Sequence, residues 1–439
     1  MTISKDAYVQ MLNAFRQENP NYLNTMPEAT VDNILNVGNF IASHPVVLND
    51  FFNVLNKVVE TYVNSPKFDN PLGSFKRASS GYGDTIEEIF VGLTDARLYD
   101  DVQDGSDLYS TETPNIAAAY HRKNREEKYK VTVKQHEQMK AVLSAEGMDN
   151  IVNKMIGSLT QSNNRDEYKL TKALITSAYV SRDLHLVEVG DVDVSPSELI
   201  TQARMYYNKT RFEHRYNAYG VRTMDEPGKL NMIMDIETEA RTDVNVLANA
   251  FNMSKSDFLG KRKVIDSFHD GNIVAGLFSD DFFVIADNLI QSTSRFDESS
   301  LKTNYWLHVH QTISRSPFAT GILFVKEIPE DYEARMVLDP INSTFGHELR
   351  PSLDVTAELI GFDKPGVDLS TATFTANVDN TSAVTVSVTG NKITLTPKDT
   401  GAKPGDVITL AVTATYGEVG TEKEITKLGK YQISKSYKG

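Results

Sequence analysis

The sequence contains no cysteine. That absence excludes disulfide scaffolds, thiolate metal sites, iron–sulfur clusters and cysteine nucleophiles. Long apolar runs are also missing, because no window approaches the roughly 18 consecutive apolar residues that a transmembrane helix needs. Residues 1–20 lack a basic segment followed by an apolar one. We therefore expect a protein that neither spans a membrane nor carries a secretory signal.

The common catalytic and nucleotide-binding motifs are absent too. The sequence has no P-loop, no G-x-G-x-x-G fingerprint and no G-x-S-x-G nucleophile motif. The pair Gly81 and Gly83 lacks the strand-to-helix context that a dinucleotide site requires. We expect no catalytic residues, no metal and no cofactor.

Charge is acidic overall and unevenly spread. The chain has 45 Lys and Arg against 59 Asp and Glu, for a net charge of −14. This excess argues against a general nucleic-acid binder, which gains affinity from clustered cations. Residues 352–439 hold nine Lys and ten acidic residues and no Arg or His, so nearly all the net charge falls on the first 351 residues. The shift near 350 predicts two units of different character.

The sequence of the C-terminal unit predicts β-strands. Its segments alternate apolar and polar residues and are rich in Val and Thr, which is typical of half-buried antiparallel strands. Gly390-Asn391 is a dipeptide suited to a tight hairpin turn. We predict a small β-sandwich whose strands are 355–360, 371–378, 383–388, 392–396, 407–415 and 425–434.

The first 351 residues predict an α+β fold with no regular βα alternation. Apolar residues recur at helical spacing over 45–62, and again over 139–178 with a break at Gly147. Capping signals predict short helices after Thr242 and Ser254. Strand-like runs lie at 86–91, 263–268, 282–286 and 321–325. Between the two helical regions, residues 65–110 predict a long extended excursion, a kind of segment that usually serves a partner or a function.

Three groups of side chains are candidates for chemistry. His308 and His310 share a strand face, and Asp191 with Asp193 and Asp280 with Asp281 form acidic pairs. We favour structural histidines and solvated carboxylates, because no third ligand of suitable spacing accompanies them. The basic stretch 121–130 is favoured as a solvated helix or an intersubunit salt-bridge surface over a nucleic-acid contact.

Several segments together resemble a known family. They are Asp69-Asn70-Pro71-Leu72, the stretch DTIEEIF at 84–90, Pro114-Asn115-Ile116 followed by YHRKNR at 120–125, DVNVLANAFNMSKSDFLG at 243–260 and YWLHVHQTISRSPFA at 305–319. In this order they resemble the major capsid proteins of small short-tailed phages of the phi-29-like group. The resemblance covers nearly all of the first 351 residues.

The resemblance implies a Hong Kong 97-type capsid fold, an α+β fold, followed by a bacterial immunoglobulin-like (group 2) domain. The implied division is an N-terminal arm and helix at 1–64, an extended loop at 65–110, a peripheral domain with a spine helix at 111–182 and 300–350, an axial domain at 183–299, and the immunoglobulin-like domain at 351–439.

The implied role is a structural subunit that self-assembles into hexamers and pentamers of an icosahedral or prolate phage head. The implied partners are other copies of the chain, a scaffolding protein and a portal protein. The shell encloses double-stranded DNA without sequence-specific binding, and it assembles in the host bacterial cytoplasm as part of the virion.

We predict that assembly residues lie on the extended loop and in the basic stretch, where charged and aromatic side chains are available to pair across subunits. These residues are Lys67, Phe68, Phe75, Lys76, Arg77, Tyr82, Glu87, Arg122, Arg125, Glu126 and Lys128.

Two other classes of function stay open. Small Thr-rich β-sandwiches occur in bacterial surface proteins, so an adhesion or binding module is the main alternative, although the sequence shows no signal peptide or anchor. An enzyme is the remaining class, and its best form is a metal-dependent activity through His308 and His310.

Overall fold

The computed structural model describes most of the chain. The described residues are 5–18, 20–22, 25–44, 46–47, 50, 68–77, 85–93, 116–134, 147–191, 196–226, 228–242, 261–340, 343–346, 351–417, 421–435 and 437. They divide into two compact units. One comprises Met1–Ile86, His121–Thr171 and Ile285–Ile313, and the other comprises Glu87–Tyr120, Lys172–Val284 and Ser314–Gly439.

In the first unit, two N-terminal helices share a small apolar core. They are α1 (Lys5–Glu18) and α2 (Ile34–Ser43), with the short 3-10 turn η1 (Pro20–Tyr22) after α1. Leu12 and Phe15 of α1 and Val37 and Ile41 of α2 are buried. The Asn13 side chain donates to the Ala29 carbonyl and accepts from the Ala29 amide, so it holds the connecting segment against α1.

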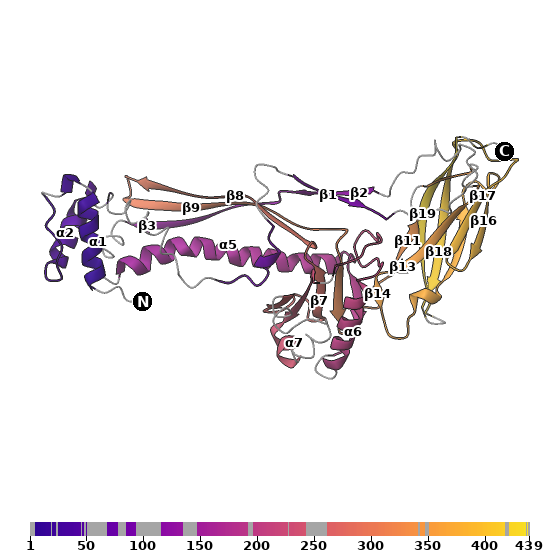
Figure 1. The fold of residues 1–439 in the computed structure, drawn as a ribbon, viewed down its shortest axis with the longest axis horizontal. Helices are drawn as coiled ribbons and strands as arrows, with labels where there is room; N and C mark the ends of the chain where they lie inside the picture. The colour runs from indigo at the N-terminus through magenta and orange to yellow at the C-terminus, as the bar shows by residue number, and fades with distance from the viewer. Residues whose placement is uncertain are drawn as a thin grey trace, which may run out of the picture. The chain divides into compact units, whose positions relative to one another are not determined.

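The same unit contains most of a three-stranded sheet and the part of a long helix that packs on it (Figure 1). The strand order is β3 (Arg125–Lys134), β9 (Lys302–Arg315) and β8 (Phe283–Asp297). The helix α5 runs over Gly147–Val180. Leu159 of α5 packs on Leu307 and Val309 of β9, because alternate residues of that strand point to one face.

The second unit is built around a six-stranded mixed sheet. Its order is β14 (Phe362–Asp363), β4 (His185–Glu188), β10 (Gly321–Val325), β7 (Ile273–Ser279), β5 (Leu230–Asp235) and β6 (Arg262–Ile265). Every residue of β7 and β10 is buried, which explains their unbroken apolar sequence.

Two helices accompany this sheet. The apolar stripe of α6 (Pro196–Lys209) packs on it through Leu199, Ala203 and Tyr206. The short α7 (Ile236–Arg241) follows β5, and Asp235 caps its start by accepting from the Thr238 amide at 2.7 Å.

The C-terminal strands form two four-stranded sheets that pack against each other (Figure 1). One has the order β11 (Arg335–Asp339), β13 (Leu353–Ile360), β17 (Lys392–Pro397) and β16 (Val384–Thr389). The other has the order β12 (Thr344–Phe345), β19 (Lys423–Ile433), β18 (Val407–Tyr416) and β15 (Thr373–Val378). Gly390, at φ +61°, makes the turn between β16 and β17.

Two further elements come from the predicted extended loop and the segment after it. The 3-10 turn η2 covers Gly73–Phe75. The strands β1 (Thr85–Val91) and β2 (Ile116–Arg122) form a separate two-stranded sheet. In the described part of the chain, no helix is both long and apolar enough to cross a membrane.

Much of the predicted secondary structure is confirmed. All six C-terminal strands form within about two residues of their predicted bounds, as do the strands at 86–91 and 321–325. The long helix begins at the predicted break, Gly147. The predicted helix at 45–62 falls largely outside the described residues, and the helices predicted after Thr242 and Ser254 fall outside them.

One prediction is wrong. The stretch 121–130 is not a helix but the end of β2 and the start of β3, because β3 pairs with β9 along its whole length.

The division into arm, loop, peripheral, axial and immunoglobulin-like parts stays a prediction. Strand β10, in the segment 300–350, pairs with both β4 and β7 in the six-stranded sheet. Strands β11 and β12 precede residue 351 and pair with strands of the C-terminal sheets.

A substitution at the centre of the six-stranded sheet is expected to lower stability strongly. Phe324 of β10 is fully buried. We expect Phe324→Ala to lower the free energy of unfolding by about 3–5 kcal/mol, since it removes a buried ring and leaves a cavity. Chemical denaturation of the purified chain measures this loss. The control Val388→Ala, at a position 38 % exposed on β16, is expected to change stability by about 0.5 kcal/mol or less.

Candidate assembly interface

The sheet of β1 and β2 has two different faces. On one face, the Phe90 ring stacks on Phe318 with ring centroids 5.5 Å apart. On the same face, the Ser316 hydroxyl donates to the Glu88 carboxylate at 2.7 Å. This inner face is therefore anchored to residues 316–318 of its own unit.

The opposite face of this sheet is apolar and exposed. Ile89 and Val91 of β1 are each 58 % exposed, and Ile116 and Tyr120 of β2 are 57 % and 63 % exposed. Glu87 lies on the same face, because the Tyr120 hydroxyl donates to its carboxylate at 3.0 Å. Clustered exposed apolar side chains of this size are typical of an interaction surface. We call Ile89, Val91, Ile116 and Tyr120 the β1–β2 outer face.

A second group of residues is a polar network in the first unit. Lys76, directly after η2, forms ion pairs of 2.9 Å with both Glu167 of α5 and Asp287 of β8. The Glu167 side chain is only 6 % exposed. A carboxylate so deeply buried needs a charged partner, since an unpaired buried charge is strongly destabilising.

Gln311 of β9 connects the two carboxylates. Its side-chain amide donates at 2.6 Å to Glu167 and at 2.6 Å to Asp287. Its carbonyl oxygen accepts from the buried guanidinium of Arg125. Lys76, Glu167, Asp287, Gln311 and Arg125 form what we call the Glu167 network.

The network extends from Arg125 along β3. Arg125 also donates to the Tyr129 hydroxyl at 2.6 Å and to Glu127 at 2.9 Å. Tyr129 in turn donates to Asp166 of α5 at 3.0 Å. Burial, together with Asp166 and Glu127, raises the pKa of Tyr129, so its hydroxyl stays protonated and able to donate.

The pKa of Lys76 shows which effect dominates in the network. Burial alone lowers it, but the hydrogen bonds and charges of Glu167 and Asp287 outweigh burial and raise the pKa above its ordinary value. Lys76 is therefore charged throughout the physiological range. Its contribution to stability is fully present below the pKa of an unfolded lysine and is lost only as alkaline pH passes the folded value.

The predicted assembly residues fall into three groups. Lys67 and Tyr82 lie outside the described residues. Five others have contacts inside their own unit: Phe68 packs on Tyr168, Phe75 is buried, Lys76 and Arg125 join the Glu167 network, and the Arg77 amide donates to the Ile285 carbonyl. Glu87, Arg122, Glu126 and Lys128 have exposed side chains.

Sequence reasoning missed the partners of the network. Glu167, Asp287 and Gln311 are far from Lys76 in the chain, and no local motif connects them. The β1–β2 outer face could have been predicted from the sequence. Ile89 and Val91 alternate with Phe90 in a strand flanked by polar residues, so the two side chains lie on the face opposite Phe90.

The candidate metal-binding histidines and acidic pairs lie beside ordinary hydrogen-bonding and ion-pairing side chains. His308 lies 3.1 Å from the Thr293 hydroxyl, and Asp280 accepts from Asn231 and Lys261. Asp193 lies outside the described residues. Within the described ranges, no three His, Asp or Glu side chains gather as a metal site does.

Comparison with known proteins identifies the family. A family model described as the Phi29-like phage major capsid protein matches residues 12–325. The chain belongs to this family. The major capsid protein of Bacillus phage GA-1 is 30 % identical over 416 residues, which cover 90 % of this chain and 87 % of that protein. The major capsid protein of Bacillus phage PZA is 31 % identical over 327 residues, 72 % of each chain.

A solved structure is similar in fold. In the capsid structure of Staphylococcus phage Andhra, one chain matches with a TM-score of 0.51 and 12 % identity, covering 60 % of this chain and 86 % of that one. This Phi29-like major capsid protein is therefore a structural subunit of a phage capsid shell and a component of the virion, not an enzyme. The adhesion alternative finds no support in these relatives.

The Glu167 network predicts a matched pair of variants. We expect Lys76→Met to lower the free energy of unfolding by about 2–3 kcal/mol, because it leaves the Glu167 and Asp287 carboxylates without the cation that they share. Adding Glu167→Gln removes one of those charges and should recover part of the loss, which a double-mutant cycle measures by denaturation.

The double variant supplies the control for this pair. No recovery of stability when Glu167→Gln is added to Lys76→Met would show that the network is not electrostatically important.

Proposed function

We propose that this major capsid protein adopts a Hong Kong 97-type fold with an immunoglobulin-like C-terminal domain. Three features support the proposal: the long helix α5 beside the sheet of β3, β8 and β9, the six-stranded mixed sheet, and the separate two-stranded sheet of β1 and β2. In this assignment α5 is the spine helix, the six-stranded sheet is the axial domain, and β1 belongs to the extended loop. The two packed four-stranded sheets are the immunoglobulin-like domain.

The β1–β2 outer face is the observation that carries the assembly proposal. Its inner counterpart is held by Phe318 and Ser316, whereas Ile89, Val91, Ile116 and Tyr120 are open to solvent. In a closed shell each subunit lies beside other copies, so the occupant of this face is a neighbouring subunit in the same hexamer or pentamer. Burying four such side chains supplies apolar area that favours association.

Four of the predicted assembly residues are exposed charges. Glu87 lies on the β1–β2 outer face, Arg122 is the last residue of β2, and Glu126 and Lys128 lie on β3. Exposed charges contribute more to register and partner choice than to affinity. Of the predicted assembly residues, these four are the ones that we assign to contacts between subunits.

The remaining partners follow from the capsid role. A shell that packages double-stranded DNA is assembled in the bacterial cytoplasm with a scaffolding protein and a portal protein. The net charge of −14 supports an inner wall that repels the DNA phosphates rather than binding them.

Assembly is tested by placing a charge on the outer face. We expect Ile89→Asp to leave a folded subunit with unchanged denaturation, because the side chain is already exposed, and to abolish or strongly reduce shell formation. Co-expression with the scaffolding protein, followed by negative-stain microscopy and sedimentation, measures the yield of shells.

A matched control uses an equally exposed apolar residue elsewhere. Leu428 on β19 is 65 % exposed, so Leu428→Asp adds the same charge to the C-terminal sheets. Shells from Leu428→Asp but not from Ile89→Asp support the proposal. Normal shell yield from Ile89→Asp would contradict it.

A further inference from the structure

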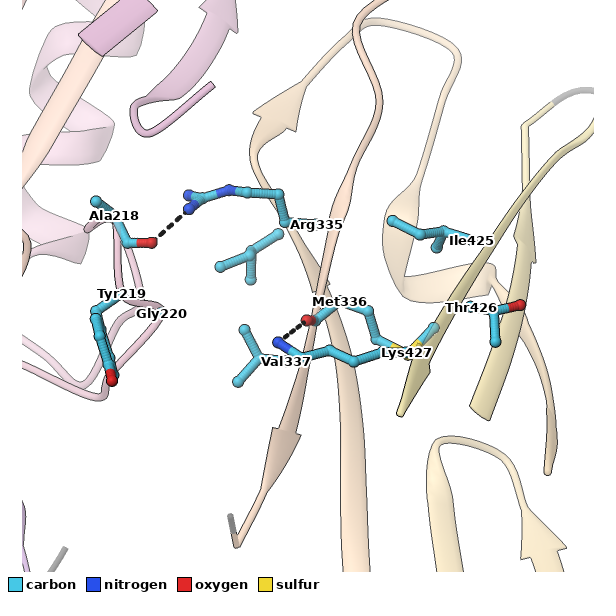
Figure 2. A pocket seen from close by; sticks show the side chains of 10 residues that line it. Ala218, Tyr219, Gly220, Arg335, Met336, Val337, Ile425, Thr426 and Lys427 are labelled. Atoms are coloured by element: carbon cyan, nitrogen blue, oxygen red, sulfur yellow. Dashed lines mark hydrogen bonds between the residues drawn. The ribbon is translucent and has the colours of Figure 1, made fainter. Parts of the chain in front are cut away.

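A pocket of about 300 Å³ lies in the second unit, between the turn at 217–220 and the C-terminal strands (Figure 2). One wall is formed by Ala218, Tyr219 and Gly220. The other walls come from β11, from Ile360 at the end of β13, and from β19. Val337, Ile360 and Ile425 contribute apolar side chains to a lining that is mainly polar.

Two cations line this pocket. Arg335 of β11 is partly buried and donates to the carbonyls of Ala218 at 2.7 Å and Asn217 at 3.3 Å. Its Nε is buried and has no hydrogen-bond partner. Lys427 of β19 lies at the exposed rim and donates to the Met336 carbonyl at 2.9 Å. Figure 2 shows the Arg335 side chain extending from β11 toward Ala218, and the Lys427 side chain extending toward Met336 of β11.

Neither cation has a carboxylate partner in the described part of the chain. None of the described residues that line the pocket is acidic. The carboxylates nearby already have partners: Arg215 pairs with Glu358 at 2.9 Å and with Asp339 at 2.7 Å. Asp183, whose charge reaches Arg335, pairs with Arg315. The pocket therefore carries two positive charges and no negative one.

The pKa directions of Arg335 and Lys427 are consistent with two cations that lie close together in one pocket. Burial lowers the pKa of Arg335, although the charge of Asp183 opposes the shift. Burial also lowers the pKa of Lys427, and the charge of Arg335 lowers it further, so the two cations lie close enough to repel each other. Partly buried like charges without a counterion are unfavourable, and a bound anion removes that penalty.

We propose that this pocket binds a small oxyanion, a phosphate or a carboxylate group, between Arg335 and Lys427. The remaining Nη–H donors of the Arg335 guanidinium suit two oxygens of one anion, and Lys427 supplies a further N–H donor. A bound anion then connects the 217–220 turn with β11 and β19 and stabilises the contact between them.

The test measures thermal unfolding of the purified, unassembled full-length chain in sodium phosphate, in sodium acetate and in sodium chloride at equal ionic strength. We expect a saturable rise in melting temperature in phosphate beyond that in chloride. A rise in acetate as well shows that carboxylate oxygens are sufficient, whereas a rise in phosphate alone shows a phosphate site.

Variants assign the effect to the two cations. Lys427→Gln should weaken phosphate binding by about 10- to 100-fold, the loss expected for one charge-assisted hydrogen bond. Lys430→Gln, an exposed lysine on the same strand, is the matched control and should leave binding unchanged. Arg335→Lys is a second variant that keeps the charge but removes the guanidinium donors.

Calorimetric titration of the wild-type chain with phosphate is independent of how stable the variants are. No saturable heat, or equal melting temperatures in phosphate and chloride, would overturn the proposal. So would unchanged phosphate binding in both Lys427→Gln and Arg335→Lys.

Discussion

The first unit depends on one buried carboxylate. Glu167 lies almost fully buried on α5, where Lys76 and Gln311 supply its closest hydrogen bonds and Lys76 compensates its charge. Those two residues come from the segment before β1 and from β9. A single requirement for charge compensation thus connects three parts of the chain that local sequence does not connect.

This connection explains why two predicted assembly cations have structural roles. Lys76 pairs with Glu167 and Asp287, and Arg125 donates to Gln311, so both cations hold the internal geometry of the first unit. The β1–β2 outer face differs from them, because its four apolar or aromatic side chains are each more than half exposed. We therefore assign association to exposed apolar area rather than to these two charges.

The sequence predicted local elements well and long-range pairing poorly. The C-terminal strands could be predicted because the alternation of buried and more exposed residues along one strand is a local signal, as in β18. The basic stretch was misread because its charges suggested a solvated helix, whereas pairing with β9, far along the chain, makes it a strand. The placement of β10 beside β4 and β7 likewise depends on strand order, which no window of sequence contains.

The parallel pairing of β14 with β4 ties the C-terminal strands to the six-stranded sheet. The chain leaves β13, passes Gly361 at φ +127° and immediately adds Phe362 and Asp363 to the sheet, beside Leu186 and Val187. The C-terminal region therefore covers an edge that is otherwise open to pairing with any exposed strand. Without this region, β4 would be an exposed edge strand that can pair with a strand of another subunit and cause aggregation. A phage lacking the region would need another protection of that edge, such as a charge or a proline on β4.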